Sequence, residues 1–319
     1  MLISRFLAWT LPVAMVVAGA GAASGQNYPN KAIRIVTSAA GGTVDLIARI
    51  IAPGLSGALG QSVVTENRPT IIAIETVAKA PPDGYTLLVA AGTLWIGPLL
   101  QKVPYNSTRD FSPISMATSS SNILVVHASL PVTAVRELIA LAKSRPGELN
   151  FSVGPPGSYP FLAANLFKSM AGLDIVSVSY KGSGEALTAL LSGEVHLTFG
   201  TPGSLATHVK SKRLRALAVT SAEPSALASG LPTLAASGVP GYEAVASQGV
   251  FAPAGTPTGI VNQLNQEIVR FINRTDVKEK FFSLGLETVG SSPERLAAAM
   301  QSEISKWGKL IKAAGIYAE

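Results

Sequence analysis

Few side chains in this sequence have the type and spacing that catalysis or metal binding requires. The three histidines are His127, His196 and His208, and none has a second histidine two or four residues away. Cysteine is absent, which excludes thiol catalysis and cysteine-bound metals. A G-x-S-x-G nucleophile elbow, a P-loop and a G-x-G-x-x-G turn after a predicted strand are also missing. We therefore predict that the protein is not an enzyme and holds neither a metal nor a cofactor.

A different pattern recurs along the chain: a short apolar run, a turn of small residues, and the start of a helix. Glycines in such turns let a ligand approach the backbone, and the free N–H groups of a helix N-terminus attract a carboxylate. Any α/β protein contains some turns of this kind, so one alone indicates little. Several of them in a chain without catalytic motifs favour a ligand receptor. The turns are at 38–43, 154–158, 182–184 and 200–204.

Apolar residues recur with the periods of strands and helices in alternation. Val44, Ile47 and Ile51 predict a helix that begins near Thr43, with a kink at Pro53. This alternation is typical of α/β domains with largely parallel sheets, and 319 residues suffice for two of them. Strands are expected at 32–36, 62–66, 85–90, 114–118, 122–127, 150–153, 175–179, 195–199, 215–220 and 248–252, and helices at 133–144, 160–171, 184–191, 205–211 and 293–314.

The composition argues against a nucleic-acid partner. Charged residues make up only 14% of the chain, compared with about 25% in an average protein. The 25 Lys and Arg residues exceed the 19 acidic residues only slightly, and no run of basic residues concentrates the net charge of +6. Since binding to phosphates requires a clustered basic face, we predict no nucleic-acid binding.

The N-terminal residues 1–25 have the pattern of a cleaved signal peptide. Arg5 precedes an apolar run at 6–20, and small residues follow it as far as Gly25. A membrane anchor is the alternative, but the run is shorter than the roughly 20 residues that span a bilayer. We therefore expect a mature protein that starts near Gln26 and resides in the periplasm.

Seven short motifs follow one another along nearly the whole mature chain. They are Y-P-N-K-A-I-R-I-V at 28–36, G-G-T-V-D-L-I-A-R at 41–49, E-N-R-P at 66–69, P-D-G-Y-T-L-L at 82–88, Y-K-G at 180–182, L-R-A-L-A-V-T at 214–220 and F-A-P-A-G-T-P at 251–257. Each is weak alone, but their order and spacing are specific. Together they resemble the Bug family, the extracytoplasmic solute receptors of tripartite tricarboxylate transporters.

This resemblance implies a type II periplasmic-binding-protein fold, in which two α/β lobes close on a small organic acid in the cleft between them. The first lobe would comprise 26–122 and 247–319, and the second 123–246. The function implied is capture of a carboxylate and its delivery to the membrane permease subunits of a tripartite tricarboxylate transporter. Two alternatives are a ligand-sensing adaptor for a membrane sensor kinase and a secreted hydrolase, which the missing catalytic motifs disfavour.

The resemblance also implies where the ligand binds. In the family, the loop after the first strand and its counterpart in the second lobe hold a ligand carboxylate through backbone amides, hydroxyls and bridging waters. The matching positions are Ser38, Ala40, Gly41, Gly42 and Thr43 in the first loop, Gly154, Gly157 and Ser158 in the second, and Thr201 on a third wall.

Departures from the family pattern bear on the ligand. The family usually has several glycines where this chain has T-I-I-A-I at 70–74, and Pro155 and Pro156 remove two N–H donors. Fewer donors and more apolar wall predict an acid with a larger hydrophobic body, such as an aromatic or branched carboxylate. Because the loops contain no Lys or Arg, we expect N–H groups and hydroxyls to bind it. The alternative is an ion pair with Arg49, Arg68 or Lys181.

Overall fold

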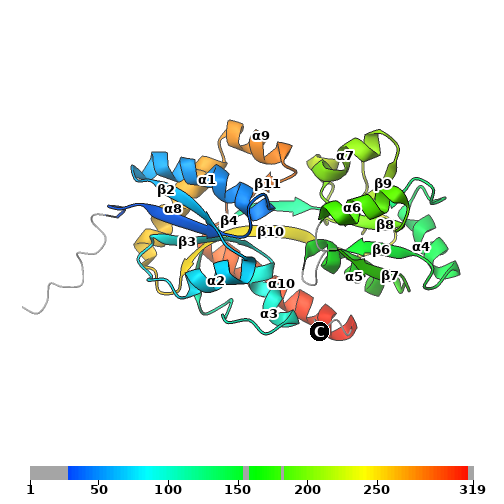
Figure 1. The fold of residues 1–319 in the computed structure, drawn as a ribbon, viewed down its shortest axis with the longest axis horizontal. Coiled ribbons are helices and arrows are strands. Elements are labelled where there is room, and N and C mark those ends of the chain that lie inside the picture. Colours follow the sequence, from blue (N-terminus) through cyan, green and yellow to red (C-terminus); the bar gives the residue numbers. More distant parts are fainter. Residues whose placement is uncertain (1–27, 154–157, 181–182, 315–319) are drawn as a thin grey trace, which may run out of the picture.

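The computed structural model describes residues 28–153, 158–180 and 183–314. The predicted signal peptide, Gly154, Gly157 and Lys181 therefore lie outside the described residues. Figure 1 shows two sheets, each covered by helices, joined by strands that pass from one to the other. We call them lobe 1 and lobe 2. No helix in the described ranges is long and apolar enough to cross a membrane.

Lobe 1 is built on a six-stranded sheet in the order β11-β4-β10-β3-β1-β2. Strands β1, β2 and β3 are parallel, whereas β10 is antiparallel to both β3 and β4. Its strands are β1 (Ile33–Thr37), β2 (Val63–Asn67), β3 (Thr86–Ala91), β4 (Phe111–Ser121), β10 (Val245–Pro253) and β11 (Glu287–Thr288), and its helices are α1 (Thr43–Leu59), α2 (Thr70–Ala78), α3 (Thr93–Leu100), α8 (Thr258–Ile272), α9 (Thr275–Ser283) and α10 (Pro293–Ala314).

Lobe 2 is built on a five-stranded sheet in the order β7-β6-β8-β5-β9. Strands β6, β7 and β8 are parallel, and β5 is antiparallel to β8 and β9. Its elements are β5 (Ile123–His127), α4 (Val135–Ser144), β6 (Asn150–Val153), α5 (Tyr159–Ala171), β7 (Val176–Ser179), α6 (Ser183–Ser192), β8 (Leu197–Gly200), α7 (Pro202–Lys210), β9 (Leu214–Val219) and the 3-10 turn η1 (Ala226–Ala228).

Two crossovers connect the lobes, and they lie next to each other. The first runs from β4 to β5 through Asn122, and the second returns from β9 to β10. Ser121 at the end of β4 pairs with Val245 at the start of β10. Backbone hydrogen bonds from Thr220 N to Asn122 O (2.9 Å) and from Ala244 N to Thr220 O (2.8 Å) continue this pairing between the lobes. The predicted two-lobe α/β architecture is confirmed. The expectation of largely parallel sheets is wrong. Each sheet contains one strand that enters its lobe and one that leaves it, and these two strands run in opposite directions, so both sheets are mixed.

The helices pack against the sheets through the apolar stripes that the sequence shows. Ile47, Ile51 and Leu55 on α1 are fully buried, and their side chains join the core between the sheet and α8. Pro53, where a kink was predicted, lies inside α1, which continues from Thr43 to Leu59. Helices α2, α3, α8 and α9 were not predicted. The apolar residues of α2 and α3 show no polar face, a pattern that does not distinguish a short buried helix from a strand.

Candidate ligand site where the lobes meet

The register of the strands places the predicted loops at the junction of the lobes. Strand β4 ends at the junction and β10 begins there, so β3, which is antiparallel to β10, also ends there. The parallel strands β1 and β2 run the same way, which brings Ser38, Thr70 and Thr93 to one edge of the sheet. In open α/β sheets, ligands bind outside the carboxyl ends of the strands.

The strands of lobe 2 also place their carboxyl ends at the junction. Strand β5 begins at the junction, and Ile123 at its start pairs with Gly200 at the end of β8. The parallel strands β6 and β7 therefore end at the junction too, and Ser158 and Thr201 are the N-caps of α5 and α7 on this edge. The predicted residues of both lobes that lie in the described ranges thus belong to the two edges that face each other.

Asp45 holds the loop between β1 and α1 in place. Its carboxylate accepts hydrogen bonds from the Gly41 N–H (2.9 Å), Asn67 Nδ2 (2.7 Å) and Arg49 Nε (3.0 Å), and Asn67 also donates to Ser38 O (2.7 Å). Asp45 is only 2% exposed. Burial by itself would raise the pKa of Asp45, but the hydrogen bonds from Asn67, Gly41 and Arg49 outweigh it and hold this pKa below its usual value.

Glycine has two separate roles in this loop. Gly41 has φ = +82°, a left-handed conformation that glycine adopts without strain. Gly42 is the N-cap of α1 with an ordinary φ of −79°, and no side chain in the described part of the protein caps the helix. The N-terminus of α1 is therefore open to an acceptor from outside the helix, while Ala40, Gly41 and Thr43 around it are exposed.

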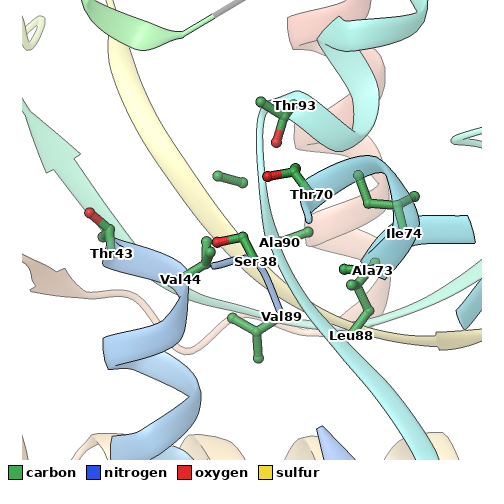
Figure 2. Close-up of a pocket in the computed structure, with 11 residues that line it drawn as sticks. Ser38, Thr43, Val44, Thr70, Ala73, Ile74, Leu88, Val89, Ala90 and Thr93 are labelled. Atoms are coloured by element: carbon green, nitrogen blue, oxygen red, sulfur yellow. The ribbon is translucent and has the colours of Figure 1, made fainter. Parts of the chain in front are cut away.

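A pocket of about 230 Å³ opens beside this helix N-terminus. Figure 2 shows the hydroxyls of Ser38, Thr70 and Thr93 turned toward the same space, with Ala73, Ile74 and Leu88 along its apolar side. Its lining consists of Ser38, Thr43, Val44, Thr70, Ala73, Ile74, Leu88, Val89, Ala90, Ala91 and Thr93.

This pocket unites only part of the predicted site. Of the predicted residues, Ser38 and Thr43 line it, whereas Ser158 and Thr201 lie on the lobe 2 edge. Thr70 and Thr93 also line the pocket and were not predicted from the sequence. The available signal was their position, because each follows a strand that is parallel to β1, as Ser38 follows β1 itself.

Arginine side chains near the loop already have acidic partners. Arg49 pairs with Asp45, and Arg68 pairs with Glu66 (Nε–Oε1 2.5 Å) and donates to Thr76 Oγ1 (3.3 Å). No Lys or Arg is among the residues that line the pocket in the described part of the chain. This arrangement favours neutral donors over an ion pair from Arg49 or Arg68.

The two hydroxyls of lobe 2 differ in their hydrogen bonds. Ser158 is the N-cap of α5, and its Oγ is buried without a hydrogen-bond partner among the described residues. Thr201 Oγ1 donates to Ser204 Oγ (3.0 Å), which in turn donates to Thr201 O (2.9 Å). A carboxylate needs donors, so we expect Ser158 to contribute more to binding than Thr201.

We predict that Ser158→Ala weakens carboxylate binding about tenfold or more, since a hydrogen bond to a charged group contributes roughly 1.5–3 kcal/mol. Arg68→Met should leave the affinity unchanged, because Arg68 is paired with Glu66. Isothermal titration of both variants compares the two kinds of donor. Weaker binding by Arg68→Met together with wild-type binding by Ser158→Ala would refute recognition by neutral donors.

Comparison with known proteins identifies the family. Residues 47–316 match the model of the tripartite tricarboxylate transporter family receptor, TctC. The chain belongs to this family. This confirms the resemblance found in the sequence, and it places the chain among solute-binding receptors rather than enzymes.

Relatives of this receptor are similar over almost their full length. A protein of the tcbD-tcbE intergenic region of Pseudomonas sp. is 37% identical over 94% of this chain and 91% of its own. Protein BugT of Bordetella pertussis is 34% identical over 95% of this chain and 96% of its own.

Solved structures agree with the fold. Rpa4515 of R. palustris, solved with adipate, has 38% identity and a TM-score of 0.80, covering 91% of this chain and 99% of that one. MatC of Rhodopseudomonas palustris, with bound malate, has 29% identity and a TM-score of 0.76, covering 89% and 100%. The periplasmic binding protein BugD has 28% identity and a TM-score of 0.77, covering 92% and 100%. The predicted type II periplasmic-binding-protein fold is thus confirmed.

Proposed function

We propose that this receptor captures a small carboxylate between its lobes and delivers it to the membrane permease subunits of a tripartite tricarboxylate transporter. The observation that carries the proposal is the N-terminus of α1, uncapped among the described residues, beside a pocket whose described lining has hydroxyls and no lysine or arginine. Helix N–H groups and hydroxyls are donors that suit a carboxylate. The adipate and malate bound to two similar structures support the same ligand class.

The pocket also supports a preference for an apolar body on the acid. Residues 70–74, which replace the glycines usual in the family, form the first turns of α2, and Ala73 and Ile74 line the pocket. With Leu88 and Val89 they form a wall without polar side chains. A carboxylate bound at the N-terminus of α1 would place its apolar body against this wall. We propose an aliphatic, branched or aromatic acid as the ligand.

We further propose that 26–122 with 247–319 and 123–246 are the units that move when the ligand binds. The two crossovers lie side by side and are joined by backbone hydrogen bonds at Asn122, Thr220 and Ala244, so both can act as one hinge. Closure about a hinge of this kind surrounds the ligand and removes it from water.

A thermal-shift screen tests the ligand class. Adipate, malate and benzoate should each be compared with the corresponding amide, which has the same shape without the charge. An acid present at 100 times its Kd stabilises the folded protein by about 2.7 kcal/mol, and the amide should give no shift. If amides stabilise the protein as well as acids do, the proposed carboxylate site is wrong.

The proposed location is the periplasm, after cleavage of residues 1–25. The apolar run at 6–20 and the small residues that follow it support this proposal. Mass spectrometry of the protein from a periplasmic extract should give a mature N-terminus near Gln26. Retention of Met1 in that fraction would contradict the predicted cleavage.

A further inference from the structure

Side chains from both lobes meet at Glu303 in the middle of α10. Its Oε2 accepts hydrogen bonds from Trp95 Nε1 (2.6 Å) and from Tyr159 Oη (3.0 Å), and its Oε1 accepts one from Ser247 Oγ (3.2 Å). Trp95 on α3 and Ser247 on β10 belong to lobe 1, like Glu303 itself. Tyr159 is the first residue of α5 in lobe 2. Tyr159 Oη also accepts a hydrogen bond from the backbone N–H of Ser247 (3.3 Å), so two hydrogen bonds of this hydroxyl join the lobes.

The surroundings of Tyr159 are shaped for this contact. A Cβ atom on Gly92, the N-cap of α3, would lie 2.9 Å from both Cε2 and Oη of Tyr159, closer than real Cβ atoms come to other heavy atoms. Gly92 has φ = −51°, which any residue can adopt. The close approach of the tyrosine, rather than the backbone conformation, thus explains the glycine. Burial raises the pKa of Tyr159 well above its usual value, and the charge of Glu303 adds to this effect.

The lobes also touch through a second set of residues. Ser225 Oγ in lobe 2 donates to Glu287 Oε1 on β11 of lobe 1 (3.0 Å). Gly203 on α7 of lobe 2 lies against Gly285 of lobe 1. A Cβ atom added to Gly285 would be 3.6 Å from the backbone nitrogen of Gly203. The lobes are thus in contact at two separate places, and the Tyr159–Glu303 bond belongs to one of them.

We infer that Glu303 and Tyr159 are positioning residues for ligand binding. Tyr159 directly follows Ser158, whose buried hydroxyl has no partner among the described residues. The hydrogen bonds of Tyr159 Oη with Glu303 and with Ser247 N fix the N-terminus of α5, and with it Ser158, against lobe 1. Loss of these bonds shifts the receptor toward an open arrangement, and the share of binding-competent molecules sets the apparent affinity. The inference concerns closure of the same cleft and rests on the proposed function.

The test compares Tyr159→Phe, which removes only the hydroxyl that joins the lobes, with Ser247→Ala. The second variant removes the side-chain bond to Glu303 inside lobe 1 and keeps the backbone N–H that donates to Tyr159 Oη. The chain has no cysteine, so Ala58→Cys on α1 and Ala206→Cys on α7, both exposed, accept one spin label in each lobe. Pulsed electron paramagnetic resonance then measures the distance between the labels without any ligand. Thermal unfolding of each variant shows that it is folded at the temperature of the measurement.

We expect Tyr159→Phe to lengthen the distance between the labels, while Ser247→Ala keeps the wild-type distance. With adipate as the probe, Tyr159→Phe should also raise the Kd about tenfold, which corresponds to about 1.4 kcal/mol. Wild-type distances in Tyr159→Phe, or equal lengthening in both variants, would overturn the inference. Failure of the wild-type protein to bind adipate argues against that acid as ligand, but the distances measured without ligand still decide the role of Tyr159.

Discussion

Gly42→Leu is expected to abolish the stabilisation of the receptor by its carboxylate while leaving the fold intact. Among the described residues, an added Cβ at Gly42 would meet Ala39 O at 3.5 Å and Ser38 Oγ at 3.7 Å, which are ordinary contacts. The φ of −79° also suits a leucine. The rest of the leucine side chain would extend into the space beside the N-terminus of α1, where the ligand carboxylate is proposed to bind.

A second glycine on the same helix provides the matched control. Gly57 lies on α1 and is exposed, and an added Cβ there has no atom within 4 Å. Gly57→Leu should bind the carboxylate as the wild type does, and it should gain up to about 1 kcal/mol of stability from its higher helix propensity. Thermal shifts with and without the acid measure both effects. An unchanged ligand shift in Gly42→Leu would place the site elsewhere.

Asp45→Asn is expected to destabilise the fold by about 2 kcal/mol, because hydrogen bonds to a buried charge are lost. In the wild type, Gly41 N–H, Asn67 Nδ2 and Arg49 Nε all donate to the carboxylate. The NH₂ group of the asparagine would face one of these donors and could not accept its hydrogen bond. The loop that carries Ser38 loses its anchor, so carboxylate affinity should fall as well. Chemical denaturation and isothermal titration measure the two effects separately.

The pH dependence of this effect follows from the lowered pKa of Asp45. A carboxyl whose pKa is lower in the folded state binds its proton more readily in the unfolded chain, where the pKa is about 3.9. Its stabilising contribution is therefore complete above about pH 5 and is lost as the pH falls through the unfolded and then the folded pKa. The stability difference between wild type and Asp45→Asn should be constant from pH 7 to 5 and shrink below that.

An exposed aspartate distinguishes this effect from general loss of charge. Asp276 forms an ion pair with Arg274 on the surface, with both side chains more than half exposed. Ion pairs of this kind contribute little, because water and salt screen them. Asp276→Asn should therefore leave stability and carboxylate affinity unchanged. If the two aspartate variants behave alike, the loop does not depend on the network around Asp45.

Local patterns in the sequence were sufficient for much of the fold. Strand β6 was predicted at 150–153 and α10 at 293–314, and both have these bounds in the structure. The loop at 38–43 was predicted from a strand, a small-residue turn and a helix start, and it lies at the junction of the lobes. Such features depend on neighbouring residues, whose periodicity and turn preferences can be read directly along the chain.

Contacts between distant segments were decided only by the tertiary structure. The sequence does not reveal that apolar residues of α2 and β3 form one wall of a pocket. That wall depends on the order of the strands, in which β1 lies between β2 and β3. The sequence left Arg49 open as a ligand for the acid, whereas the structure pairs it with Asp45. Likewise, Tyr159 and Glu303 are 144 residues apart and meet only when α10 packs against α5. The physical reason is that packing sets these partners, and no local pattern encodes which distant side chain a group will meet.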